Sequence, residues 1–430
     1  MRYFNSNYLK RLRGKDRNRY MKLTRFISRT MPPDYDDYQR IGYEIIGPVL
    51  YGFAKWLESS RKKDGIEKLF FLAREGELLR KAYIIAAKGG GAETSYLRVS
   101  RMATSIPCLD RVNTPDELIK RVYLPRAGTM TDLLESCGLD EDTISEIARQ
   151  AAVDTAAPAI GLPDGEKEKI YLAAKPYIDR QAKEQTELVN GYMKQQSFCG
   201  RCGIVDIGWK GTMQNNLEDL FPQVDMHGYY MGLRRDKAAV RNSAPNRHGF
   251  LFGDSEKVTE TQRKMSSTLS VFENFFLSCD GSTLKYALEN GVYVPVLNAP
   301  EHNERCAKII RRVQRAALAF VKECADSPFG SSPLNADDCF AAYEKFAVTP
   351  SNKTVSLLRP FVVYNTETSY LVSEHSLLYY MVHPKAFYKD FLNNTCKVIF
   401  LKSVFLLPLP YYSLWKLLHS FDRTPINPIE

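Results

Sequence analysis

One segment of the chain constrains the fold more than any other, CGIVDIGWKGTMQNNLEDLF at residues 202–221. An apolar run, Cys202–Val205, leads into a glycine-rich stretch at Asp206–Gly211. Residues Thr212–Leu220 then place apolar side chains at helical spacing. The segment therefore predicts a strand, a turn and a helix, which is the repeating unit of an α/β fold.

The same order occurs earlier, in EKLFFLAREGELL at residues 67–79. The apolar run Leu69–Ala73 predicts a strand, and a charged turn with Gly76 leads into a second helix. Residues 95–101 predict a short strand, and residues 227–233 and 248–253 predict two more. We therefore expect a Rossmann-like α/β fold: a largely parallel sheet flanked by helices, with a helical insertion and a helical C-terminal region.

Three regions are predicted along the 430 residues. A basic arm with a following polar segment occupies 1–38, the α/β domain with a helical insertion at about 112–198 occupies 39–300, and a mainly helical region occupies 301–430. The insertion opens with a predicted capping box between Thr114 and Glu117, with Pro115 at the first helical position.

The net charge of +9 is concentrated at one end of the chain. The first 30 residues contain ten basic residues and one acid, and the remaining 400 balance at 49 against 49. This arm is either a solvated tail or a site for an anionic membrane surface, where each cation contributes about 1 kcal/mol. Nucleic acid is the weakest option, because the rest of the chain is neutral and shows no nucleic-acid-binding motif.

Hydropathy and cysteine content indicate where in the cell the protein is expected. No window approaches 18 uncharged apolar residues, and nine cysteines in this length suit reduced thiols. The most apolar stretch, Val398–Leu409, is followed by Tyr411, Tyr412 and Trp415. It is either a terminal core helix or a helix lying on a membrane. We expect a cytoplasmic protein, with peripheral contact to the inner face of the cytoplasmic membrane as the alternative.

The strongest chemical signal lies between the strand at 202–205 and the next helix. Gly208 and Gly211 let a ligand approach the backbone, while Lys210 supplies a cation and Thr212 a cap or a phosphate contact. Asp206 could hold a ribose hydroxyl or Mg²⁺. The segment is neither GxxxxGK[ST] nor GxGxxG. It partly resembles the phosphoribosyltransferase loop, with one acid where that loop has two, and an ordinary tight turn is the alternative.

Charged residues follow the other two predicted strands. Arg74, Glu75 and Gly76 come after the first, and Ser100 and Arg101 after the second. If the strands are parallel neighbours, these side chains share one crevice with Lys210 and Asp206. Three cations and two carboxylates suit a phosphorylated substrate, with a carboxylate left for general-base work or Mg²⁺. Considered alone, each of these charged residues is expected to form an ordinary ion pair at the surface.

Other catalytic patterns are not supported. Cys199 and Cys202 form one CxxC, without a second pair or a histidine at ligand spacing, and are expected to be ordinary thiols. The six histidines form no HxH or HxxxH pair, so a zinc enzyme is not predicted. No GxSxG motif occurs, which argues against a serine hydrolase of that kind.

Five motifs in order resemble a domain of bacterial cell-surface polysaccharide biosynthesis proteins. They are IGPVLYGFAKWL, LFFLAREGELL, YLRVSR, VDIGWKGTMQNNL and FENFFLSCDGSTLKY, within residues 43–295. In that group the domain often follows a haloacid-dehalogenase-like domain. The resemblance implies a role in capsule, lipopolysaccharide or exopolysaccharide assembly, without fixing a reaction.

The resemblance also implies a set of site residues. They are Arg74, Glu75, Gly76, Ser100, Arg101, Asp206, Gly208, Trp209, Gly211, Thr212, Gln214 and Glu273. Two departures matter. Glu75 stands where the group has Asp, and no strand ends in the DxD of a dehalogenase-like domain, so the phosphoaspartate mechanism is not transferred.

Together these signals predict a glycosyl- or phosphoryl-group transferase that binds a phosphorylated sugar or nucleotide sugar at the carboxyl end of the sheet. Lys210, Arg74, Arg101 and the helix at Thr212 would bind phosphate, while Asp206 would hold a metal or ribose. Glu75 or Glu273 would act as the base. The alternatives are a non-catalytic membrane-surface adaptor and a phosphoribosyltransferase-like or hydrolase-like enzyme.

Overall fold

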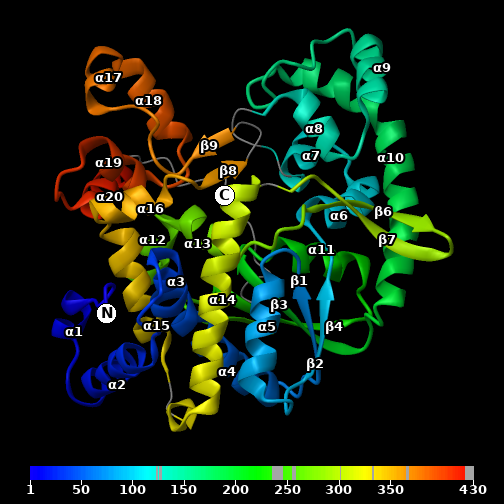
Figure 1. The fold of residues 1–430 in the computed structure, drawn as a ribbon. Coiled ribbons are helices and arrows are strands. Elements are labelled where there is room, and N and C mark those ends of the chain that lie inside the picture. The colour runs from blue at the N-terminus through cyan, green and yellow to red at the C-terminus, as the bar shows by residue number, and fades with distance from the viewer. Residues whose placement is uncertain are drawn as a thin grey trace.

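The structure is a computed structural model, and it describes residues 1–122, 124, 128–234, 246–253, 258–300, 302–331, 334–364 and 368–421 (Figure 1). Its centre is a five-stranded sheet of order β2-β1-β3-β4-β5, and every neighbouring pair is parallel. The predicted α/β class is confirmed. The strands are β1 (Lys68–Leu72), β2 (Glu93–Leu97), β3 (Arg201–Trp209), β4 (Asp225–Leu233) and β5 (Arg247–Gly249).

Alternating side chains of β1 bury into two different helical layers. Leu69 and Phe71 join a core cluster with the helices on one face, and Phe70 and Leu72 join a cluster on the other. The result is a three-layer sandwich, because a parallel sheet needs both faces covered. The first layer contains α4 (Gly47–Lys63), α5 (Gly76–Ala87) and α14 (Glu304–Asp326), and the second contains α10 (Asp164–Gln195) and α11 (Thr212–Leu220).

The helices between β2 and β3 have a hydrophobic cluster of their own, which includes Leu133, Leu134 and Ile147. They are α6 (Arg101–Ser105), α7 (Pro115–Arg121), α8 (Met130–Ser136), α9 (Glu141–Ala151) and α10. The predicted capping box is only half formed. Thr114 caps α7, but the Glu117 carboxylate accepts the backbone N–H of Asn113 instead.

The C-terminal region belongs partly to the main core. Val313 and Phe320 of α14 lie in the same cluster as α4 and α5, so no core boundary falls near residue 300. Glu301 itself lies outside the described residues. Besides α14, the α-helices and strands that follow β5 are α12 (Glu260–Ser266), α13 (Leu269–Phe276), β6 (Thr283–Glu289), β7 (Val292–Leu297), α15 (Ala336–Tyr343), α16 (Asn352–Leu358), β8 (Val362–Tyr364), β9 (Thr368–Tyr370), α17 (Leu377–Val382), α18 (Pro384–Asn393), α19 (Lys397–Phe405) and α20 (Tyr411–Phe421).

The basic N-terminal segment is folded, so the solvated-tail interpretation is wrong. It forms α1 (Ser6–Arg11) and α2 (Gly14–Thr30), and α3 (Asp37–Ile41) follows. Leu23 and Ile27 are buried in the main core. The Tyr8 hydroxyl donates to Asp338 at 2.8 Å, and the Asn5 side chain donates to the Ala341 carbonyl at 2.9 Å. Most of the segment's basic side chains nevertheless remain exposed.

The apolar stretch from Val398 forms α19, and Val398–Val404 is buried. This part of the stretch is therefore a core helix, whereas Leu406, Leu407 and Leu409 beyond it are exposed. Among the described helices, none is long and apolar enough to span a bilayer.

Candidate functional site

Parallel pairing brings the carboxyl ends of β1, β2 and β3 to one edge of the sheet. Glu75 follows β1, Arg101 begins α6 just after β2, and Asp206 lies in β3. Burial raises the pKa of Asp206, and the negative charges of Glu75 and, less strongly, Glu273 raise it further, while Arg101 opposes them. Glu75, Arg101 and Glu273 therefore each lie close enough to Asp206 to affect its charge.

The predicted turn at Asp206–Gly211 is shorter than expected. Asp206, Gly208 and Trp209 still pair with β4, so β3 continues through Trp209 and only Lys210 and Gly211 lie between strand and helix. The reason is the ladder with β4, which extends the strand beyond its apolar run. The predicted helix at Thr212–Leu220 is confirmed as α11.

Trp209 connects the end of β3 to Glu273. Its φ is +84°, a region that side-chain-bearing residues rarely adopt. The indole Nε1 donates to Glu273 Oε1 at 2.8 Å, and the ring stacks on Phe252 with centroids 5.8 Å apart. The Trp209 carbonyl also accepts the Arg234 N–H at 2.7 Å. Strain held in place by several contacts is typical of functional sites.

Two glycines shape the backbone beside Trp209. Gly208 has φ +95°, and a Cβ there would lie 2.7 Å from the Gly232 carbonyl oxygen. Gly211 has φ +66° and is itself the N-cap of α11, so Thr212 is not the capping residue. Gly211 has no side chain with which to cap α11, so an anion could bind the first N–H groups of the helix at this edge. Lys210 and Thr212 are half-buried there.

Asp206 is the most perturbed group of the site. Its side chain is buried, Oδ1 accepts the Ile207 N–H at 2.8 Å, and burial raises its pKa to about 8. At neutral pH it is therefore mainly a neutral acid, able to donate a proton. A bound cation would itself lower the pKa of Asp206, and Mg²⁺ commonly uses only one or two carboxylates together with water and phosphate. The magnesium site at Asp206 therefore stays a prediction.

Arg74 lies beside Glu75, whose Oε2 accepts the Arg74 backbone N–H at 3.1 Å. It also lines a cavity of about 270 Å³ that holds a second cation, Arg311, which the sequence did not single out. The next residue, Gly76, allows α5 to start close to β1, because a Cβ would lie 2.8 Å from the Phe71 carbonyl carbon.

Two predicted binding residues make structural contacts instead. Ser100 caps α6 by accepting the Ala103 N–H at 3.0 Å and donates to the Thr283 carbonyl at 2.5 Å. Gln214 is buried, and its side-chain oxygen accepts the Tyr230 hydroxyl at 2.5 Å. Both side chains hold neighbouring elements together, so we do not assign them to ligand binding.

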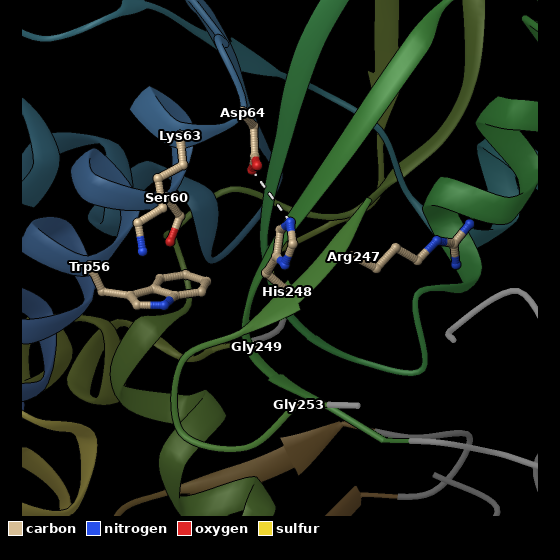
Figure 2. A pocket seen from close by; sticks show the side chains of 8 residues that line it. All are labelled: Trp56, Ser60, Lys63, Asp64, Arg247, His248, Gly249 and Gly253. Carbon is tan, nitrogen blue, oxygen red and sulfur yellow. Dashed lines mark ion pairs between the residues drawn. The ribbon is translucent and has the colours of Figure 1, made fainter. Parts of the chain in front are cut away.

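A second polar cluster, missed by the sequence analysis, contains Asp64, His227 and His248. Its members belong to different elements and are up to 184 positions apart, so no spacing motif could reveal them. The cluster borders a different cavity (Figure 2).

In comparisons with known proteins, no family model matches this chain and no curated protein matches it significantly. The assignment to polysaccharide biosynthesis therefore stays a prediction from sequence motifs.

Proposed function

We propose that the protein is a transferase of bacterial cell-surface polysaccharide biosynthesis, acting in the cytoplasm on a phosphorylated sugar or nucleotide sugar. The observation that carries the proposal is the meeting of Glu75, Arg101, Asp206 and Glu273 at the carboxyl edge of the parallel sheet. Open α/β sheets bind ligands at that edge.

Phosphate recognition is assigned to the start of α11 and to nearby cations. The first N–H groups of α11 lack a side-chain cap, and its dipole favours an anion. The assignment is supported by position along the chain, since Lys210, Arg101 and Arg74 follow the carboxyl ends of three neighbouring parallel strands. Together they would neutralise a sugar phosphate or diphosphate.

Group transfer needs a proton for the leaving group and a base for the acceptor. In a glycosyl transfer, Asp206 would protonate the phosphate oxygen as the sugar carbon–oxygen bond breaks. Glu75 would take the proton of the acceptor hydroxyl as the new carbon–oxygen bond forms, and solvent would return both groups to their starting states. These two roles, acid and base, fit the different environments of the two carboxyl groups, because Asp206 is buried and Glu75 is half-buried. Phosphoribosyltransferase-like and hydrolase-like reactions would use the same phosphate contacts.

Lys210→Ala tests the phosphate contacts. We expect the variant to bind the true ligand more weakly by about 1–3 kcal/mol, because a charge-assisted hydrogen bond is lost. Thermal-shift measurements with nucleotide sugars, sugar phosphates, phosphoribosyl pyrophosphate and polyprenyl-phosphate mimics, with and without Mg²⁺, would identify the ligand class. Lys322→Ala is the control, since its side chain is 75% exposed on α14. Equal loss in both variants, or none in Lys210→Ala, would contradict the assignment.

A second candidate function, a membrane-surface adaptor, is favoured by a separate observation. The C-terminal helices α17 and α18 expose large apolar side chains beside lysines. Leu378 is 75% exposed and Val382 is 73% exposed, and Lys385 and Lys389 lie on the following turns. Apolar and cationic groups together suit an anionic bilayer surface. Figure 1 places α17 and α18 at one end of the molecule.

Replacing Leu378 and Val382 together with Ser tests this second function. We expect binding to vesicles of anionic phospholipid to fall by at least about tenfold, because each apolar side chain removed from the bilayer costs more than 1 kcal/mol. Leu172→Ser is the control, since Leu172 is 61% exposed on α10, far along the chain. Wild-type protein that stays unbound in a vesicle flotation assay would rule the adaptor out.

A further inference from the structure

Three potential metal ligands meet beside the sheet, away from the site proposed above. Asp64 follows α4, His227 lies in β4, and His248 lies in β5, next to Tyr229 of the neighbouring strand. One donor atom of each ligand lies within 4.8 Å of the others. Figure 2 shows the Asp64 carboxylate facing the His248 ring, with His248 Nε2 at 3.3 Å from Asp64 Oδ2. His227 Nδ1 lies 4.0 Å from the same oxygen.

The two histidine nitrogens that face Asp64 lack hydrogen bonds. His227 Nδ1 and His248 Nε2 are both buried atoms, and neither has a hydrogen-bond partner within the described part of the chain. Buried polar atoms without partners are rare, because each costs free energy. Two such atoms facing one carboxylate, His248 Nε2 at 3.3 Å and His227 Nδ1 at 4.0 Å, form a set of donors that a cation would fit.

We propose that Asp64, His227 and His248 bind a divalent transition-metal ion of the Zn²⁺ type. Imidazole nitrogen suits zinc, whereas magnesium prefers oxygen ligands and water. Three protein ligands leave a fourth tetrahedral position open, as in zinc sites that bind water or substrate. The site is separate from the sheet edge at Asp206 and does not depend on the function proposed for that edge.

Neighbouring groups orient two of the ligands. The Tyr229 hydroxyl donates to Asp64 Oδ2 at 2.6 Å and so helps to hold the carboxylate beside the two histidines. A metal on His227 Nδ1 needs the ring proton on Nε2, where it would point to the Asp225 carboxylate at 3.5 Å. Arg201, which pairs with Asp225 at 3.2 Å, also lies 3.3 Å from Nε2; because arginine can only donate, this contact favours the other tautomer and opposes metal binding.

The open position would face a cavity of about 390 Å³. Trp56, Ser60 and Lys63 line it opposite His248 (Figure 2). Arg247 also borders the cavity, but its guanidinium bonds to Glu218 at 2.6 Å and points away from Asp64. Lys63 gives this cavity a cationic wall, which suits a small anionic ligand.

The experiment is a titration of the full chain with Zn²⁺ after removal of metals by chelation, using a purification tag without histidine. Calorimetry should give one zinc ion per chain. His248→Ala should weaken binding at least about 100-fold, since even changes to supporting groups typically cost about 10- to 100-fold. Tyr229→Phe, which removes only the hydroxyl that orients Asp64, should weaken it about tenfold.

His383→Ala is the matched control, because His383 is exposed at the start of α18 and should leave zinc binding unchanged. Circular dichroism would confirm that each variant is folded. Co²⁺ offers an independent readout, since a four-coordinate site gives an intense visible spectrum that His248→Ala should lose. Wild-type protein that binds no zinc, or folded His248→Ala that binds it as well as wild type, would overturn the proposal.

Discussion

Asp206→Asn is expected to unfold at a higher denaturant concentration than wild type above pH 8. Burial raises the pKa of Asp206 to about 8, so folding binds a proton that the unfolded chain releases above about pH 4. Wild-type stability should therefore fall as pH rises from about 4 to 8, by several kcal/mol in total. Asn has the same shape, stays neutral and avoids this loss.

Urea denaturation of both proteins across that pH range is the measurement. The difference between them isolates Asp206, because histidines titrate in both. Asp110→Asn is the control, since its side chain is 55% exposed and should not alter the pH dependence. If Asp206→Asn shows the wild-type slope, Asp206 titrates normally and its role as an acid fails. If Asp206 is the proposed acid, the more stable variant should be the less active one.

Gly208→Ala is expected to destabilise the protein by about 2–5 kcal/mol. A left-handed conformation costs a side-chain-bearing residue about 1–2 kcal/mol. At Gly208, with φ +95°, the added Cβ would also lie 2.7 Å from the Gly232 carbonyl oxygen, and overpacking typically costs a further 1–3 kcal/mol or so. Because the contact is backbone, no side-chain rotation relieves it.

Gly291→Ala separates the cost of the left-handed backbone conformation from the cost of the close contact. Gly291 has φ +80° in the β6–β7 hairpin, and a Cβ there meets nothing within 4 Å. Its substitution should cost only the conformational part, about 1–2 kcal/mol. Equal losses of unfolding free energy in the two variants, measured by urea denaturation, would show that the approach of β3 to β4 is not tight.

The local sequence predicted the individual helices and strands well, but it did not predict how they contact one another. The strand at 69–73 and the helix at Thr212–Leu220 carried their own apolar patterns and glycines, and they appear within one residue of the expected bounds. The extension of β3 to Trp209 depended on pairing with β4, which no local pattern reports. Strand order was also unreadable, since it depends on contacts distant in sequence.

The candidate site shows the same division. Residue type and position at strand ends were enough to select Glu75, Arg101 and Asp206. They could not separate ligand-facing groups from structural ones, because Gln214 depends on the position of Tyr230 in a neighbouring strand. The sequence could not predict the cluster of Asp64, His227 and His248 either, because the two histidines meet only through the pairing of β4 with β5.

The placement of the N-terminal helices has a consequence for synthesis on the ribosome. Asn5 and Tyr8 find their partners at Ala341 and Asp338, more than 300 residues later. These residues must therefore wait for the synthesis of α15 before their contacts can form. After they leave the ribosome they stay open to proteases and chaperones until then, so α1 should be protected only late in synthesis.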